Sequence, residues 1–289
     1  MPAAATTHGC RAAPVSDTVA ITLRSGGRQR SAVVHVPPGT TAGQRLPIVL
    51  AFHGSGSTGA SMAGYSGFSV VADGEGFLAV YPDAIGGVWN QGSTATNAPD
   101  DVRFTADLLD VLDDRWCVDP RRVYATGVSN GGGMVARLGC QLSARTAAIA
   151  PVAGSYAGLP PCHPDRPVSV LEIHGTRDSV VPYAGSPPHG AGSVPAFLAA
   201  WRARDGCATR TTQHSIAPHT LQIDAMRCAQ GTAVRHIQIG GGWHQYPGAS
   251  PADRGPRATI SAAWQSWRFF AGKRLAFPAV RPSRLEHTG

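Results

Sequence analysis

The residues around Ser129 have the types and spacing that a serine nucleophile requires. The stretch Gly127-Val128-Ser129-Asn130-Gly131 fits the pattern G-x-S-x-G, and it is the only such stretch in a chain with 35 glycines. In such a turn the serine lies at a strained backbone position between a strand and a helix, so glycines are needed two residues before and after it. The flanking residues are β-prone before the turn and helical in pattern after it. The stretch therefore predicts nucleophilic catalysis at Ser129.

A serine hydroxyl is a weak nucleophile until a base takes its proton, and the base needs an acidic partner to hold its tautomer. Asp178 follows an apolar strand through a tight turn, and His244 lies in a glycine-flanked loop before the last predicted helix. The other ten histidines come too early in the chain or lack such a loop. We therefore predict that Ser129, Asp178 and His244 are catalytic. An aspartate that only satisfies loop amides is the alternative for Asp178.

The tetrahedral intermediate of such a reaction needs two donors directed at its oxygen. One is the amide of the residue after the nucleophile, Asn130, and the other should come from the turn that begins at His53. We assign the second donor to the amide of Ser55, with Gly56 as the alternative. The side chain of His53 is then expected to anchor the loop. This chemistry implies no metal and no organic cofactor.

Three aromatic residues lie in loops near these positions, and we predict that Trp89, Trp243 and Tyr246 line the acyl or alcohol pocket of the substrate. An aromatic wall suits a polyester segment and a phenolic acid equally well. For Trp89 the alternative is packing beneath its own loop. Asp100 and Asp101 precede a predicted helix, where we expect them to cap the helix and anchor the loop.

Strands and helices alternate along the chain, after a predicted antiparallel hairpin at residues 19–36. Apolar strands are predicted at residues 47–52, 76–81, 123–126, 147–152, 168–174 and 232–239, and helices at 62–74, 101–116, 134–138, 194–204 and 257–270. This order predicts the α/β class, with a mainly parallel central sheet and helices on both faces. Ligands of such sheets bind at the carboxyl ends of the strands, where Ser129, Asp178 and His244 are all predicted to lie.

The composition bounds the domain organisation and the partners. With 289 residues, 43% of them hydrophobic and 15% charged, the chain can bury one large core. We expect a single catalytic domain with a core at about residues 19–271, a flexible N-terminal segment and a C-terminal tail.

The net charge of +7 comes from scattered arginines, so a nucleic-acid partner is not expected. No stretch reaches the roughly 18 apolar residues of a membrane span, and we expect a monomer.

The six cysteines are even in number, and none forms a C-x-x-C pair, which argues against a zinc ribbon or a redox dithiol. From their placement we predict three disulfides, Cys117–Cys140, Cys207–Cys228 and Cys10–Cys162. Disulfides imply secretion, with a signal peptide already removed. Six buried free thiols in a cytosolic enzyme are the alternative.

An ordered set of motifs extends these arguments. The set comprises His53-Gly54, Tyr81-Pro82-Asp83 with Trp89-Asn90, Asp100-Asp101-Val102, Val118-Asp119-Pro120 to Gly133, His174-Gly175-Thr176 with Asp178 and Pro182-Tyr183, and Gly241-Gly242-Trp243-His244-Gln245-Tyr246-Pro247-Gly248. Together they resemble the extracellular polyhydroxybutyrate depolymerase and feruloyl esterase family, which is similar to carbohydrate esterase family 1. The resemblance covers roughly residues 21–270. It implies the α/β-hydrolase fold and a secreted carboxylic ester hydrolase with the catalytic residues named above.

One motif departs from the family's pattern. The family usually reads Gly-Gly-Gly-His-x-Trp-Pro-Gly near its histidine, whereas Trp243 here replaces the third glycine and Tyr246 replaces the tryptophan. This difference leaves His244 aligned and changes the expected substrate contact.

These observations predict a serine esterase that acts through an acyl-enzyme. The first substrate class is polyhydroxybutyrate or a related aliphatic polyester, and the alternative is a feruloyl or acetyl ester of plant polysaccharide such as xylan. A catalytically silent hydrolase fold used for binding is an alternative of another class, which the presence of all three catalytic residue types disfavours. A peptidase is disfavoured because no lid or second domain that could sort peptides is apparent.

Overall fold

A computed structural model describes residues 17–185, 192–248 and 260–275. The N-terminal segment before residue 17 and most of the C-terminal tail, both predicted to be flexible, lie outside the described residues.

Ten strands form one sheet within the described residues, in the order β1-β2-β4-β3-β5-β6-β7-β10-β9-β8. They are β1 (Thr18–Ser25), β2 (Arg28–His35), β3 (Leu46–Phe52), β4 (Leu78–Pro82), β5 (Val118–Val128), β6 (Ala148–Val152), β7 (Ser169–Gly175), β8 (Thr211–Ala217), β9 (Thr220–Ala225) and β10 (Val234–Ile239). The central strands β4, β3, β5, β6, β7 and β10 are mutually parallel. The β1–β2 and β8–β9 hairpins add antiparallel strands at the two edges. The predicted mainly parallel sheet with an antiparallel N-terminal hairpin is confirmed.

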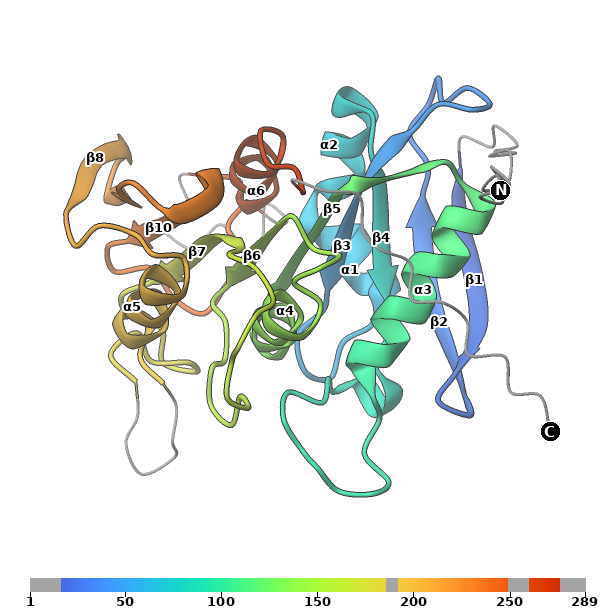
Figure 1. The fold of residues 1–289 in the computed structure, drawn as a ribbon, viewed down its shortest axis with the longest axis horizontal. Coiled ribbons are helices and arrows are strands. Elements are labelled where there is room, and N and C mark those ends of the chain that lie inside the picture. The colour runs from blue at the N-terminus through green and yellow to red at the C-terminus, as the bar shows by residue number, and fades with distance from the viewer. Residues whose placement is uncertain (1–16, 186–191, 249–259, 276–289) are drawn as a thin grey trace, which may run out of the picture.

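Helices cover both faces of the sheet (Figure 1). They are α1 (Gly59–Ser66), α2 (Phe68–Glu75), α3 (Asp101–Arg115), α4 (Asn130–Gln141), α5 (Val194–Arg204) and α6 (Ala262–Phe270). The apolar sides of α3, α4 and α5 belong to one buried cluster, and those of α1, α2 and α6 belong to the other. Strand β3 shows why two layers form: Ile48 and Leu50 point into the first cluster, while Val49 points into the second. The predicted α/β-hydrolase architecture is therefore present.

One predicted helix is two helices in the structure. Residues 62–74 were expected to form one helix, but α1 ends and α2 begins at Gly67, whose φ of 77° is left-handed. A glycine adopts this conformation at no steric cost, so it ends the first helix and turns the chain. The predicted helix at 257–270 is described from Ala262 onward, because residues 257–259 lie outside the described residues.

The disulfide prediction is right for one bond and wrong for the others. Cys207 is bonded to Cys228, as predicted, and the bond joins the end of α5 to the segment after the β8–β9 hairpin. Cys140 is bonded to Cys162, so Cys117–Cys140 and Cys10–Cys162 are both wrong. The long loop after β6 returns past the end of α4, and this brings Cys162 to Cys140. Cys117 is also disulfide-bonded, and Cys10 lies outside the described residues.

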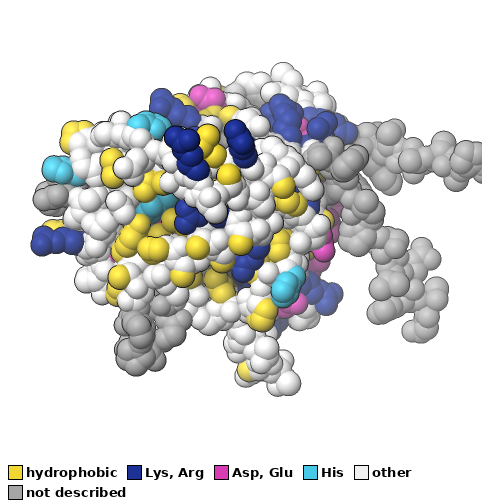
Figure 2. Space-filling view, turned by 60° about the vertical axis from the view of Figure 1, so that its left-hand side comes forward, with side chains coloured by type: hydrophobic (Ala, Val, Ile, Leu, Met, Phe, Trp, Pro, Cys, Tyr) yellow, Lys and Arg dark blue, Asp and Glu magenta, His cyan; other side chains and the backbone are white. Residues whose placement is uncertain are grey.

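Two surface observations bear on partners. Among the described helices, none combines the length and the apolar character needed to cross a lipid bilayer. Figure 2 shows arginine and lysine side chains spread singly over one face of the molecule, among hydrophobic and neutral groups, without a continuous basic strip on that face.

Candidate active site

Ser129 lies at the turn between β5 and α4, with φ 58° and ψ −120°. This conformation is costly for a residue with a side chain, and the surrounding backbone maintains it. The Ser129 amide donates to Val152 O at 3.0 Å, and its carbonyl accepts from the amides of Gly133 and Ser155 at 3.1 and 3.0 Å. A Cβ at Gly127 would lie 2.6 Å from Gly131 O, and one at Gly131 would overlap the backbone of β3. The close packing therefore requires the two glycines that the sequence pattern singles out.

Asp178 and His244 form a hydrogen-bonded pair. The Nδ1 atom of His244 lies 2.7 Å from Asp178 Oδ2, while Asp178 Oδ1 accepts from the amides of Val180 and Val181 at 2.9 and 2.8 Å. Because Asp178 is buried and ionised, with its pKa held below its usual value by hydrogen bonds that outweigh desolvation, His244 Nδ1 must donate. In the neutral ring, His244 Nε2 then carries no proton and can act as a base.

The turn after β7 and the loop after β10 are bound to each other. The amide of Arg177 donates to Gly242 O at 2.9 Å, and the amide of Gly241 donates to the hydroxyl of Thr176 at 2.8 Å. A Cβ at Gly175 would collide with the backbone of Gly242. These contacts fix the position of His244, which lies two residues after Gly242, relative to Asp178, which directly follows Arg177.

Ser129 reaches the same edge of the sheet from a different strand. Strands β5, β7 and β10 are parallel, with β6 between β5 and β7, so their carboxyl ends lie at one edge. The structure joins Asp178 to His244, but no hydrogen bond between the Ser129 hydroxyl and His244 is found among the described residues. The contact between base and nucleophile remains a prediction.

The turn after β3 lies directly against Ser129, since a Cβ at Gly54 would be 3.6 Å from Ser129 Cβ. The amide of Gly56 donates to Gly87 O at 2.9 Å, which leaves it unable to serve as an oxyanion donor. The amides of Ser55 and Asn130 donate to no acceptor among the described residues. This geometry favours Ser55 over the alternative, Gly56.

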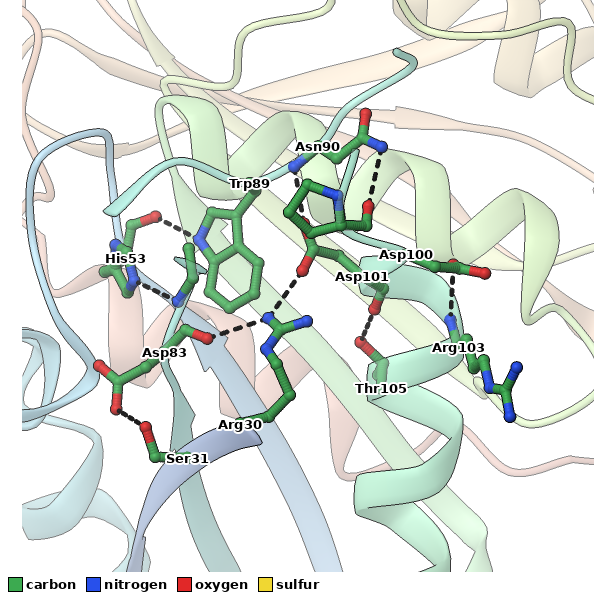
Figure 3. Close-up of polar contacts among 12 residues, drawn as sticks. Arg30, Ser31, His53, Asp83, Trp89, Asn90, Asp100, Asp101, Arg103 and Thr105 are labelled. Carbon is green, nitrogen blue, oxygen red and sulfur yellow. Dashed lines mark hydrogen bonds and ion pairs between the residues drawn. The ribbon is translucent and has the colours of Figure 1, made fainter. Parts of the chain in front are cut away.

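The side chain of His53 holds this turn in place (Figure 3). Its Nε2 accepts from the amide of Ala84 at 3.1 Å, so the proton must be on Nδ1, which donates to Gly54 O at 2.8 Å. Burial lowers the pKa of His53, which agrees with a neutral ring. His53 is therefore a loop anchor, as the sequence predicts.

Trp89 and Tyr246 do not line an open pocket. Trp89 is 2% exposed, its indole donates to His53 O at 3.0 Å, and its ring packs against Phe52. Tyr246 is 4% exposed and packs near Tyr65 in the core on the α6 side of the sheet. The prediction that these two residues contact substrate disagrees with their burial, because their rings are covered by protein. The side chain of Trp243 is 56% exposed to solvent.

The side chain of Asn130 has a role that the motif did not reveal. Its Oδ1 accepts from the amide of Trp89 at 2.7 Å, and its Nδ2 donates to Trp89 O at 3.1 Å. This pair of bonds ties the segment after β4 to the residue next to the nucleophile.

A buried ion pair fixes the same segment from the other side (Figure 3). Arg30 donates to Asp101 Oδ1 at 2.7 Å and stacks on the ring of Phe104, and the other oxygen of Asp101 accepts from the amide of Asn90 at 2.7 Å. Burial lowers the pKa of Arg30, and the adjacent Asp101 opposes this effect. Asp100 accepts from the amide of Arg103 at 3.0 Å, so the predicted capping and anchoring roles of the two aspartates are confirmed.

A cluster of polar side chains beneath Asp178 was not predicted from the sequence. His174 Nδ1 lies 2.8 Å from Glu172 Oε1, and His174 Nε2 lies 3.2 Å from Asp178 Oδ2. His236 Nδ1 lies 2.7 Å from Glu172 Oε2, and the Tyr156 hydroxyl donates to Oε1 at 3.0 Å. The available signal was a glutamate and a histidine two residues apart in an otherwise apolar strand, which places both on one face.

The charged forms of Glu172 and His174 stabilise each other. Although desolvation opposes both charges, the Glu172 carboxylate raises the pKa of His174 to about 10, and the two histidines lower the pKa of Glu172 to about 2. The cluster therefore holds a buried negative and a buried positive charge at neutral pH.

Several known proteins are similar to this chain. The sequence model of the family described as "Esterase PHB depolymerase" matches residues 30–163. Among curated proteins, "Feruloyl esterase B" of Piromyces equi is 31% identical over 230 residues, with 74% of this chain and 42% of that protein covered. "Putative esterase NocK" of Nocardia uniformis subsp. tsuyamanensis is 30% identical over 264 residues, with 82% and 77% covered. The chain thus spans less than half the length of the Piromyces relative.

Solved structures show the same fold. An acetyl xylan esterase from Aspergillus awamori superposes with a TM-score of 0.65 at 16% identity, covering 88% of this chain and 99% of that one. A ferulic acid esterase from Anaeromyces mucronatus gives a TM-score of 0.55 at 17% identity, covering 89% and 90%.

We expect Asp101→Asn to lower the free energy of unfolding by about 3 kcal/mol, because the change leaves the buried charge of Arg30 without its partner. Asp100→Ala is the matched control, since it removes only an exposed helix cap and should cost about 1 kcal/mol. Urea unfolding followed by circular dichroism measures both values. Equal losses in the two variants would contradict the proposed importance of the ion pair.

The raised pKa of His174 also predicts how stability depends on pH. A group whose pKa is higher in the folded protein stabilises it fully below the unfolded value, and this contribution is lost as pH rises through the folded value. The free energy of unfolding should therefore fall between about pH 6.5 and pH 10, by on the order of 2 to 4 kcal/mol from this group. Urea unfolding at several pH values measures the fall, which His174→Gln should reduce. Parallel curves for the two proteins would show that His174 is not the group responsible.

Proposed function

Because this chain belongs to the polyhydroxybutyrate depolymerase and feruloyl esterase family of α/β-hydrolases, we propose that it is a serine esterase that hydrolyses carboxylic esters through an acyl-enzyme. One observation carries the proposal. The Asp178–His244 pair and Ser129, with its strained backbone, come from different parallel strands and lie at the same edge of the sheet.

The first half of the proposed reaction forms the acyl-enzyme. His244 Nε2 takes the proton of the Ser129 hydroxyl as its oxygen attacks the ester carbonyl. The carbonyl oxygen becomes negative and is stabilised by the amides of Ser55 and Asn130. Asp178 holds the imidazole in the required tautomer and stabilises its charged form. His244 then gives the proton to the alcohol oxygen as the ester bond breaks, and the alcohol leaves.

In the second half of the proposed reaction, a water molecule takes the place of the alcohol and releases the acid from the enzyme. His244 takes a proton from a water molecule, whose oxygen attacks the acyl carbonyl. The same two amides stabilise the second oxyanion, and the proton returns to Ser129 as the acid is released. The reaction balances with water as the only co-substrate.

The relatives favour an acyl ester of plant polysaccharide as the substrate. Six of them are named feruloyl esterases or probable feruloyl esterases, and another is named a bifunctional acetylxylan esterase/xylanase. The polyester class, our first expectation from sequence, is supported only by the name of the family model. We therefore propose a feruloyl or acetyl ester ahead of polyhydroxybutyrate. The exposed ring of Trp243, next to His244, is suited to contact a phenolic acyl group or a sugar.

We also propose that the protein is secreted and monomeric. Cys140–Cys162 and Cys207–Cys228 form disulfides, which persist in oxidising compartments. The Cys117 disulfide is consistent with the same environment.

Ser129→Ala should lower hydrolysis of 4-nitrophenyl acetate by about 10⁴-fold or more, because the variant lacks the hydroxyl that forms the acyl-enzyme. Circular dichroism should show that the fold persists, since the alanine needs no more space than the serine. Near-normal turnover in the variant would contradict the assignment of Ser129. A wild-type protein that hydrolyses no ester would instead support the silent binding protein.

A substrate panel separates the proposed ester classes. We expect methyl ferulate or acetylated xylan to be hydrolysed at least about tenfold faster than polyhydroxybutyrate film, which corresponds to about 1.4 kcal/mol in transition-state binding. Product release can be followed by chromatography, with Ser129→Ala as the background. Faster release of hydroxybutyrate than of ferulate or acetate would restore the polyester assignment.

A further inference from the structure

His174 is enclosed by hydrogen-bond acceptors on both sides of its ring. Its Nδ1 faces Glu172 Oε1 at 2.8 Å, and its Nε2 faces Asp178 Oδ2 at 3.2 Å and Val181 O at 3.0 Å. The side chain is fully buried, so water cannot supply a donor in place of these contacts. A neutral imidazole has one donor and one acceptor, whereas only the protonated ring has two donors. The geometry therefore requires His174 to be a cation as long as Glu172 is ionised.

The surroundings of Glu172 keep it ionised. Its Oε1 accepts a hydrogen bond from the Tyr156 hydroxyl at 3.0 Å and lies 2.8 Å from His174 Nδ1. Its Oε2 lies 2.7 Å from His236 Nδ1. Donors converging on a buried carboxylate favour its charged form. The other groups near the cluster are the hydroxyl of Tyr183, which contacts His236 Nε2 at 3.0 Å, and the amide of Gln238.

Charges alternate along this line of side chains up to the active site. Glu172 is negative, His174 positive and Asp178 negative, and His244 becomes positive during the reaction. Asp178 Oδ2 is shared by His174 Nε2 at 3.2 Å and His244 Nδ1 at 2.7 Å. The two imidazoles therefore act on one oxygen, and a positive charge on His174 disfavours a second positive charge on His244.

We propose that His174 is a permanently charged positioning residue, held by Glu172, that fixes the orientation of Asp178 and makes His244 release its proton more readily. The inference rests on the proposed function, because the effect on His244 matters only if His244 is the base. His174 thereby influences the pH range in which His244 acts as a base, although it does not touch the substrate. The raised pKa of His174 agrees with this geometry.

The test compares pH profiles of kcat/KM for 4-nitrophenyl acetate between wild type and His174→Gln. The variant keeps an amide donor but has no charge, so the acid limb of the profile should move to higher pH by roughly half a unit to one unit. The kcat value should fall while KM stays within about twofold of wild type, because the substrate does not contact His174. The amides of Val180 and Val181 still hold Asp178 in the variant, so measurable activity should remain.

His236→Gln is the matched control. His236 also faces Glu172 but makes no described contact with Asp178, so its replacement should leave the acid limb in place. An acid limb that stays at the wild-type pH in His174→Gln would overturn the inference. An equal shift in both variants would also overturn the inference, because the shift would then not depend on the contact between His174 and Asp178.

A second measurement needs no change at His174. In wild-type protein labelled with ¹⁵N-histidine, one imidazole should keep both ring protons at pH 8.5, when histidines near their ordinary pKa are neutral. Spectra in which every histidine is neutral at this pH would overturn the inference. A protein that shows the charged ring but hydrolyses no ester would overturn the proposed function and the positioning role, while the charge state of His174 would stand.

Discussion

The backbone conformation of Ser129 is the constraint on which the rest of the site depends. A φ of 58° and a ψ of −120° place the serine at the tip of a turn that a residue with a side chain adopts only at a cost of about 1 to 3 kcal/mol. Three backbone hydrogen bonds from β6, α4 and the segment after β6 hold it there. The same turn brings α4 so close to β3 and β5 that no Cβ fits at Gly127 or Gly131. The strained backbone of Ser129 and the close packing of α4 against β3 and β5 therefore both follow from this turn.

Buried charges hold the loops that must meet Ser129. Arg30 and Asp101 fix the segment after β4, and Glu172 with His174 supports Asp178 after β7. Burying such charges carries a large desolvation penalty, so ion pairs of this kind contribute less to net stability than their short distances suggest. Their directional contacts instead select one loop conformation among many. In this protein both clusters lie beneath active-site loops, and this location indicates positioning as their main effect.

Most of the fold and the acid–base pair could be predicted from sequence, because strong local signals mark them. Apolar runs ending in glycine-rich turns identify the strand ends, and parallel pairing then brings Asp178 and His244 to one edge. The break at Gly67 was missed because a single glycine within a helical pattern is tolerated and does not by itself mark the end of a helix. The partner of Cys140 depends on the path of the loop after β6, and the contact of His236 with Glu172 depends on β10 lying beside β7. Such long-range neighbours leave no local pattern.

The exposed apolar side chains show where selectivity can arise. Trp89 and Tyr246 are buried as supports, whereas the exposed Val180 and Trp243 lie in the loops of Asp178 and His244, and the exposed Val88 lies in the loop after β4. Val180 donates its amide to Asp178, and Trp243 adjoins His244. Val88 follows Gly87, whose carbonyl binds the oxyanion turn at Gly56. A change that reshapes one of these loops to fit another acyl group would also move a hydrogen bond of the catalytic machinery. Under the proposed function, a backbone change in these loops would therefore alter substrate contact and catalysis together, whereas substitutions of the exposed side chains alone leave the backbone contacts intact.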